Sequence, residues 1–193
     1  MPLTPDELEE LVDQASVALQ AIQNDQGRTN TPRARIRFPR GWIGRAVSFR
    51  NRYWYAEGAT AFNVSYAHIT LDVFSWLVER TDLTGIARDM IFKESICLLG
   101  SIVEALCSHT TKGRIGKSHK FKERTTRMVV ASMITQATKD EVDWLWDLRG
   151  SVHIDELPNS ELAAYRAADV DRAMRALTSL HNDLDAHFTA VWS

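Results

Sequence analysis

Residues 84–108, TGIARDMIFKESICLLGSIVEALCS, form the stretch that decides the fold of this chain. Its large apolar residues recur at steps of three and four over so wide an arc that the predicted helix must be covered on most sides. They are Ile91, Ile96, Leu98, Leu99, Ile102, Val103 and Leu106. We therefore expect a central helix. Glu104 lies within it, and we expect this acid to reach a helix edge or to pair with an arginine, the alternative being that it orients a basic active-site group.

Amphipathic helices are predicted on both sides of this stretch. At the N-terminus, Thr4, Pro5 and Glu7 form a capping-box pattern with proline at the first helical position. Thr138 and Glu141 have the spacing of a second capping box. With the apolar spacing, these signals predict helices over about residues 5–22, 59–80, 84–108, 124–135, 138–152 and 169–191. The expected fold class is all-α, a bundle of five or six helices.

Charge is segregated along the chain, although the net charge is only −2. Residues 28–55 hold eight arginines and no acid, and residues 112–127 hold seven lysines or arginines and one acid. Such clusters favour a polyanionic partner, because they release counterions from a phosphate backbone; the other interpretation is pairing with acidic helices of the same molecule or of a second copy. The side chains that we expect to bind nucleic acid are Arg33, Arg35, Arg37, Arg40, Lys112, Arg114, Lys117, Lys120 and Lys122.

The first basic segment alternates polar and apolar residues, as a strand does. Residues 35–38 and 47–50 both alternate, and residues 39–41, Pro-Arg-Gly, have turn chemistry. This pattern predicts a small β-hairpin or an extended basic arm over residues 33–55. The neighbouring aromatic residues are either base-stacking groups or anchors that hold the hairpin on the core; they are Trp42, Tyr53, Trp54 and Tyr55.

Length and composition narrow the class of protein. A chain of 193 residues, 45% hydrophobic and 25% charged, suits one compact globular domain, residues 1–193, with residues 28–55 as a basic insertion. No apolar run reaches the 18 residues of a membrane span, and the acidic N-terminus lacks a secretory signal pattern, so we expect a cytoplasmic location. Cys107, His109 and His119 lie beside a basic segment that repels cations, so we expect no metal and no cofactor.

Arg149 and His153 are the candidate catalytic residues. They stand four apart, which places them one turn apart if a helix continues through both. His153 can take the proton of an attacking 2′-hydroxyl or protonate a leaving 5′-oxygen, and Arg149 can hold the scissile phosphate. On spacing alone, an exposed arginine and a histidine near a helix C-terminus are the favoured explanation, because arginine and histidine often stand four residues apart by chance.

The run 144–154, WLWDLRGSVHI, followed by Tyr165 and the final amphipathic helix, resembles the C-terminal half of a HEPN-superfamily domain. Residues 93–106 are similar to the hydrophobic helix of that family. The resemblance implies an all-α bundle, often dimeric, and in many members a metal-independent endoribonuclease of toxin–antitoxin or phage-defence systems. Arg149 and His153 match its Arg and His positions, with three intervening residues where four to six are usual and with Gly150 in place of a polar residue.

Three functional hypotheses follow. The first is a HEPN-type endoribonuclease acting on RNA, with an antitoxin protein as a further partner; the second is a non-catalytic module that binds nucleic acid, a nucleotide or a protein; the third is a structural dimerisation bundle. A homodimer is expected because Trp144 and Trp146 point to different faces of one helix, so that one of them lacks a core to enter. The long apolar stripe of the last helix, with His181 inside it, favours the same assembly.

Overall fold

The computed structural model describes residues 2–115, 120–150 and 165–192. The chain divides into two compact units, Met1–Arg40 and Gly41–Ser193. Within the described residues every regular element is helical, as the all-α prediction required, and there is no strand.

The first unit consists of one long helix and a short turn of 3-10 helix. Helix α1 spans Pro5–Gln26, and η1 spans Pro32–Ala34. The predicted capping box is confirmed: the Glu7 backbone N–H donates to the Thr4 hydroxyl at 3.3 Å, and the Thr4 N–H donates to the Glu7 carboxylate at 2.8 Å. The helix ends at Gly27, whose φ of 54° is a conformation that glycine adopts without strain. No residue of α1 is buried.

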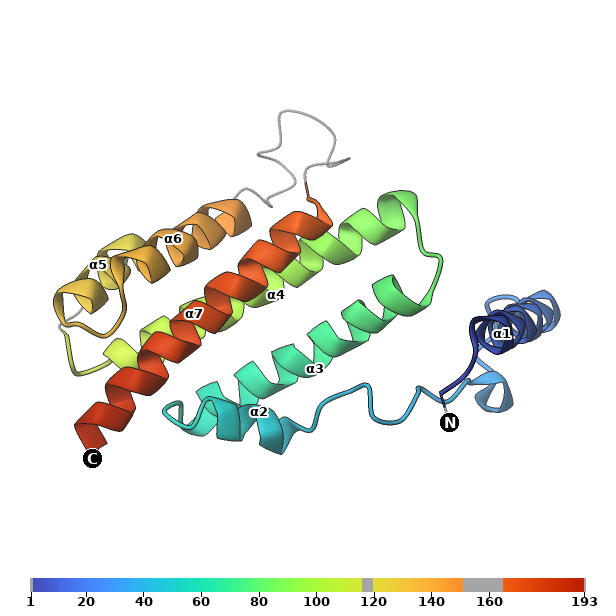
Figure 1. Ribbon diagram of the computed structural model, residues 1–193, viewed down its shortest axis with the longest axis horizontal. Helices are drawn as coiled ribbons and strands as arrows, with labels where there is room; N and C mark the ends of the chain where they lie inside the picture. The colour runs from blue at the N-terminus through green and yellow to red at the C-terminus, as the bar shows by residue number, and fades with distance from the viewer. Residues whose placement is uncertain (1, 116–119, 151–164, 193) are drawn as a thin grey trace. The chain divides into compact units, whose positions relative to one another are not determined.

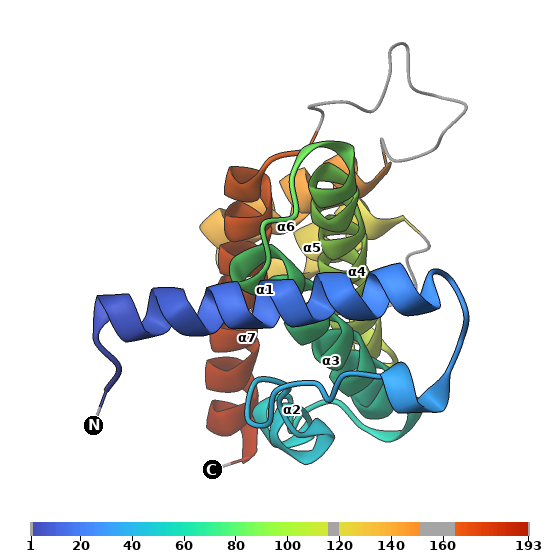
Figure 2. The same cartoon turned by 90° about the vertical axis from the view of Figure 1, so that its right-hand side faces the viewer.

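The second unit is a helical bundle built around two long helices. Its elements are α2 (Ala46–Arg52), α3 (Gly58–Arg80), α4 (Gly85–Thr111), α5 (Phe121–Val130), α6 (Gln136–Gly150) and α7 (Ala167–Trp192). Helices α4 and α7 lie side by side and run in the same direction, with α3 on one side and α5 and α6 on the other (Figures 1 and 2). Because α4 also packs against α3, α5 and α6, the predicted central position of this helix is confirmed.

The core forms where α4 meets α7. Helix α4 buries Ile96, Leu99 and Leu106 completely, and α7 buries Leu180 and Leu184 completely. Each fully buried side chain of this size contributes roughly 1.5–3 kcal/mol to folding. Most of the apolar stripe of the last helix is therefore covered inside one chain, whereas Met174 and Val191 are exposed.

The predicted β-hairpin is wrong. Residues 47–50, the second expected strand, lie in α2, and residues 35–45 have no regular secondary structure. Four alternating residues cover only about one helical turn, so the pattern does not distinguish a strand from a short helix. The Phe49 ring stacks on His68 of α3 at 4.7 Å between ring centroids, which fixes the short helix on the bundle. The six expected helices are all present, and α2 is a seventh.

None of the helices in residues 2–115, 120–150 and 165–192 is both long and apolar enough to cross a membrane.

Candidate functional site

Arg149 lies in the last turn of α6 and is held there by α4. Its Nη1 atom donates to the Glu104 carboxylate at 2.6 Å, and its guanidinium lies 5.2 Å from the centroid of the Trp146 ring. Its aliphatic stem crosses Gly100, where an added Cβ would stand 2.8 Å from the arginine Cδ. Glycine at position 100 thus lets α6 approach α4 closely enough for this contact. The side chain keeps 31% of its surface exposed.

This arrangement gives Arg149 a defined orientation and leaves it able to bind a ligand. One N–H of the guanidinium is used by Glu104, and a guanidinium carries five N–H donors in a fixed fork. Glu104 was expected either to reach a helix edge or pair with an arginine, or to orient a basic active-site group. It pairs with an arginine, and that arginine is Arg149, the predicted catalytic residue. The ion pair joins two partly exposed side chains, so its contribution to stability is small, about 0–1 kcal/mol.

His153, the second predicted catalytic residue, lies outside the described residues, as does His119. The other two residues of the Cys107, His109 and His119 group do not form a metal site. Cys107 is completely buried, and this burial raises the pKa of its thiol to about 12. His109 accepts a hydrogen bond from the Glu57 backbone N–H at 3.2 Å. Within the described segments, no three His, Cys, Asp or Glu side chains are grouped as metal ligands.

The cations of the second basic cluster have different surroundings. Lys112 and Arg114 are exposed just after α4, whereas Lys120 lies 3.8 Å from Glu123 at the start of α5. Lys122 donates to Asp147 of α6 at 2.6 Å. Lys117 lies outside the described residues. Of the predicted nucleic-acid ligands in this cluster, Lys112 and Arg114 are the two described ones that no ion pair within the described chain neutralises.

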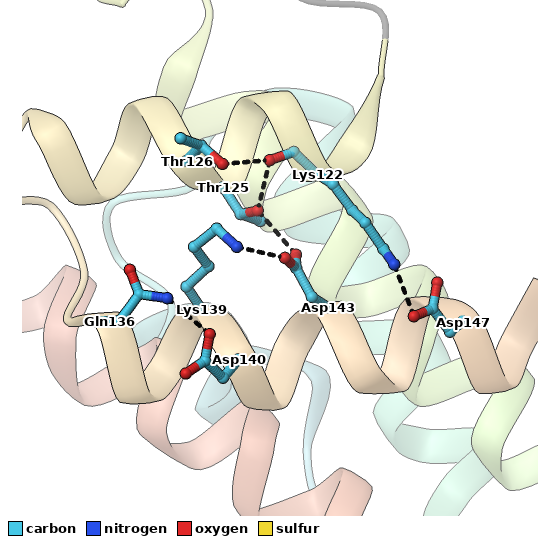
Figure 3. A network of polar contacts seen from close by, with 8 residues as sticks. All are labelled: Lys122, Thr125, Thr126, Gln136, Lys139, Asp140, Asp143 and Asp147. Carbon is cyan, nitrogen blue, oxygen red and sulfur yellow. Dashed lines mark hydrogen bonds and ion pairs between the residues drawn. The ribbon is translucent and has the colours of Figure 1, made fainter.

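Lys122 belongs to a polar network that joins α5 to α6 (Figure 3). In the same network the buried Asp143 accepts from the Thr125 hydroxyl and from Lys139 Nζ, both at 2.7 Å. The buried carboxylate is therefore doubly satisfied, as a charge in a helix interface requires. The charge of Lys122 is paired with Asp147, so this lysine is less available to bind a phosphate.

The four predicted nucleic-acid ligands of the first cluster belong to the first unit. Arg33 lies in η1, Arg35 donates to Asn30 at 2.9 Å, and Arg37 and Arg40 are exposed in irregular chain. They form a separate exposed cationic segment. The structure thus assigns the two halves of the predicted nucleic-acid surface to two different units.

Two of the aromatic residues beside the arginines are anchors. Tyr53 and Tyr55 are buried; the Tyr53 hydroxyl lies 2.9 Å from His68 Nε2, and the Tyr55 hydroxyl 3.1 Å from His181 Nδ1. Burial raises the pKa of Tyr53 to about 12 and, with the Arg52 charge, lowers the pKa of His68 to about 4. His181 is half-buried and is hydrogen-bonded within its own chain.

Trp42 and Trp54 keep part of their surface accessible. Trp42 donates its indole N–H to the Asp72 carbonyl at 2.8 Å, and Arg80 lies over its ring. Trp54 donates to Asp185 of α7 at 2.6 Å and is 40% exposed. Base stacking therefore remains a candidate role for Trp54 rather than for the two tyrosines.

The two tryptophans of α6 both find neighbours in the chain. Trp144 is covered by the Arg172 guanidinium at 3.9 Å, and Trp146 stacks on Phe121 at 4.5 Å. The expectation that one of them lacks an intrachain partner is wrong, because α5 and α7 flank α6 on different sides. The homodimer itself stays a prediction, without these two residues as its grounds.

Comparisons with protein-family models, with curated proteins and with solved structures found no match.

Proposed function

We propose that this protein is a HEPN-type endoribonuclease that cleaves RNA without a metal, with Arg149 and His153 as catalytic residues. The observation that carries the proposal is the fixed orientation of Arg149, held by Glu104 and Trp146, four residues before His153 in the chain. An arginine oriented before substrate arrives loses less conformational entropy when it binds phosphate. Glu104 is then a positioning residue.

The proposed reaction is an internal transesterification. The 2′-hydroxyl of RNA attacks the adjacent phosphorus, the bond from phosphorus to the 5′-oxygen breaks, and the products end in a 2′,3′-cyclic phosphate and a 5′-hydroxyl. His153 takes the 2′-proton or supplies the proton to the leaving oxygen. Arg149 stabilises the negative charge that develops on the phosphoryl oxygens.

The test is cleavage of single-stranded RNA by the purified full chain in excess EDTA. We expect cyclic-phosphate ends, a loss of at least about a hundredfold in rate for His153→Ala, and a loss of about a hundredfold for Arg149→Lys, since an ammonium lacks the fork. Arg172→Lys is the matched control. Arg172 also pairs with a glutamate of a neighbouring helix, Glu141 at 2.8 Å, and also covers a tryptophan of α6.

Two results would contradict the proposal. One is wild-type protein, correctly folded, that leaves RNA intact over a range of sequences. The other is cleavage that survives in His153→Ala, which would identify a contaminating nuclease or another site. An equal loss of cleavage rate in Arg149→Lys and Arg172→Lys would mean that both substitutions lower the rate by disturbing the fold.

The second candidate function is a non-catalytic module that binds nucleic acid. The observation that favours it is the exposed cationic segment of the first unit, with Arg33, Arg35, Arg37 and Arg40 and no acid between residues 28 and 55. Charge reversal there should weaken RNA binding and reduce its salt dependence, because each phosphate contact releases counterions. RNA that is bound but not cut supports this candidate.

The proposed partners follow from the first candidate. RNA is the substrate, a homodimer brings two Arg149 and His153 pairs together as in the HEPN domains that the chain resembles, and an antitoxin protein restrains cleavage inside the producing cell. Sedimentation at high micromolar concentration tests the dimer directly: a monomer there contradicts it.

A further inference from the structure

A small pocket opens in the second unit where the ends of α4 and α7 meet the segment that follows α2. Its volume is about 260 Å³. Three stretches that lie far apart in the sequence contribute to it: Trp54 after α2, Lys112 and Arg114 after α4, and Phe188 and Trp192 of α7. We refer to it as the Trp54–Trp192 pocket.

Two indole rings stand at the pocket with accessible faces. Trp54 is 40% exposed and Trp192 is 70% exposed, and their rings are nearly perpendicular, at 84°, with centroids 6.3 Å apart. The indole N–H of Trp54 is bound to Asp185, so the orientation of this ring is fixed. Exposed aromatic faces of this kind stack on nucleobases with little sequence preference.

Two cations stand beside the rings. The Arg114 guanidinium lies 4.7 Å from the Phe188 ring centroid, and its Nη1 donates to the Thr110 carbonyl at 3.1 Å, so its fork is held at the pocket wall. Lys112 is exposed at the C-terminus of α4. Their two positive charges exceed the partial negative charge of that helix end, about half an elementary charge. Among the described lining residues Glu57 carries the one carboxylate, and the Asp185 carboxylate lies beside the pocket, bound to the Trp54 indole N–H.

The remaining lining is fixed by hydrogen bonds. The ring of His109 accepts from the Glu57 N–H, and the Tyr55 hydroxyl is bound to His181. The walls are therefore set before a ligand arrives, and they present aromatic surface beside positive charge. A volume slightly below the roughly 300 Å³ at which pockets for drug-sized ligands begin suits one small ligand.

We propose that the Trp54–Trp192 pocket binds one nucleotide, with its base against the indole rings and its phosphate on Lys112 and Arg114. The nucleotide is either free or one unit of an RNA strand. None of the described residues that line the pocket belongs to α6, the helix that holds Arg149.

The experiment is a calorimetric titration of the full chain with adenosine monophosphate, adenosine and inorganic phosphate, each without RNA. We expect the nucleotide to bind more tightly than either fragment. Trp54→Leu and Trp192→Ala should each weaken the nucleotide about tenfold. Arg114→Gln should weaken the nucleotide and leave adenosine unchanged. Arg172→Gln is the matched charge control, since Arg172 is bound to Glu141 of α6 and does not line this pocket, and it should leave nucleotide binding unchanged.

A short oligoadenylate distinguishes the two sources of the nucleotide. Binding of the oligomer in competition with the monophosphate indicates a unit of a strand, and binding of the monophosphate alone indicates a free ligand. The proposal is overturned if folded wild-type protein does not bind the nucleotide at millimolar concentration, or if the pocket variants bind it as Arg172→Gln does. Trp192→Ala keeps the test valid if Trp54→Leu misfolds, because Trp192 is largely exposed near the chain end. Nucleotide binding that is unchanged in Arg149→Lys separates this site from RNA cleavage.

Discussion

Helices α1 and α7 have the same kind of sequence and opposite environments. Both are long and amphipathic, and in each the apolar residues recur at helical spacing. Helix α7 buries its stripe against α4 and α6, whereas in α1 the large apolar residues Leu8, Leu11, Val12, Leu19 and Ile22 are all exposed. The comparison teaches that periodicity predicts which face of a helix is apolar and says nothing about what covers that face.

Charge separates the two helices as well. Helix α1 carries six acids and no lysine or arginine, while α7 carries two arginines, one of which pairs with Glu141 of α6. Helix α1, of which no residue is buried, is stabilised by its capping box and by its local hydrogen bonds. Helix α7 depends on tertiary packing.

The largest expected difference between the two helices is in stability. Leu180→Ala in α7 should lower the free energy of unfolding by about 2–5 kcal/mol, because it leaves a cavity at a completely buried position. Leu11→Ala in α1 should change it by no more than about 0.5 kcal/mol, because the side chain is exposed. Urea unfolding of both variants measures the difference. Equal losses would mean that the stripe of α1 is covered in solution, and the contrast would fail.

A second difference is in the response to acid, because the bundle buries a histidine next to the Tyr53 hydroxyl and the Arg52 charge. The pKa of His68 is about 4 when folded and near 6.5 when unfolded, so between these values the unfolded chain binds the extra proton. Stability should therefore fall as the pH drops from about 6.5 to 4, by up to about 3 kcal/mol from this residue.

Unfolding free energies at pH 7, 5.5 and 4.5 test this expectation against His68→Gln. The variant removes the titrating group, so its stability should depend less on pH than that of the wild type. Parallel curves for the two proteins would show that His68 does not bind the proton.

The smallest effect concerns the helix caps. Thr4→Ala should cost α1 about 1 kcal/mol of local stability, seen as lost helical circular dichroism and faster amide exchange in the first unit. The unfolding midpoint of the bundle should not move. Thr135→Ala is the matched change in the second unit, where the hydroxyl accepts from the Thr138 N–H at 3.2 Å, and it should lower that midpoint. A midpoint lowered equally by both variants would show that the two units unfold together.

The cap of α6 shows why boundaries were harder to predict than helices. Thr138 and Glu141 have capping-box spacing, yet the helix begins at Gln136 with Thr135 as its hydrogen-bonding cap, and Glu141 binds Arg172 instead. Both threonines are favourable N-cap residues, and by sequence Thr138 is the better choice because it alone has a glutamate three residues later. Asp183 of α7 favours Thr135 as the cap, because its carboxylate accepts from the Thr135 N–H and hydroxyl.

The candidate site was predictable in part. Arg149 was identified from its place in the run 144–154, and Glu104 was noted as an acid in an apolar helix, but their pairing depends on the approach of α6 to α4 at Gly100. No motif in the sequence singles out Trp192. Its ring contacts that of Trp54, and the two residues lie near opposite ends of the second unit's sequence.

The sequence by itself determined the helices, the capped start of α1, the central position of α4 and the separation of charge. These depend on residues within a few turns of one another, where the 3.6-residue period decides which side chains are neighbours. Only the tertiary structure decided that residues 46–52 form a helix, that Lys122 is bound to Asp147 and that Arg149 pairs with Glu104. Those outcomes depend on which distant segments pack together, and the local periodicity of the sequence does not contain that information.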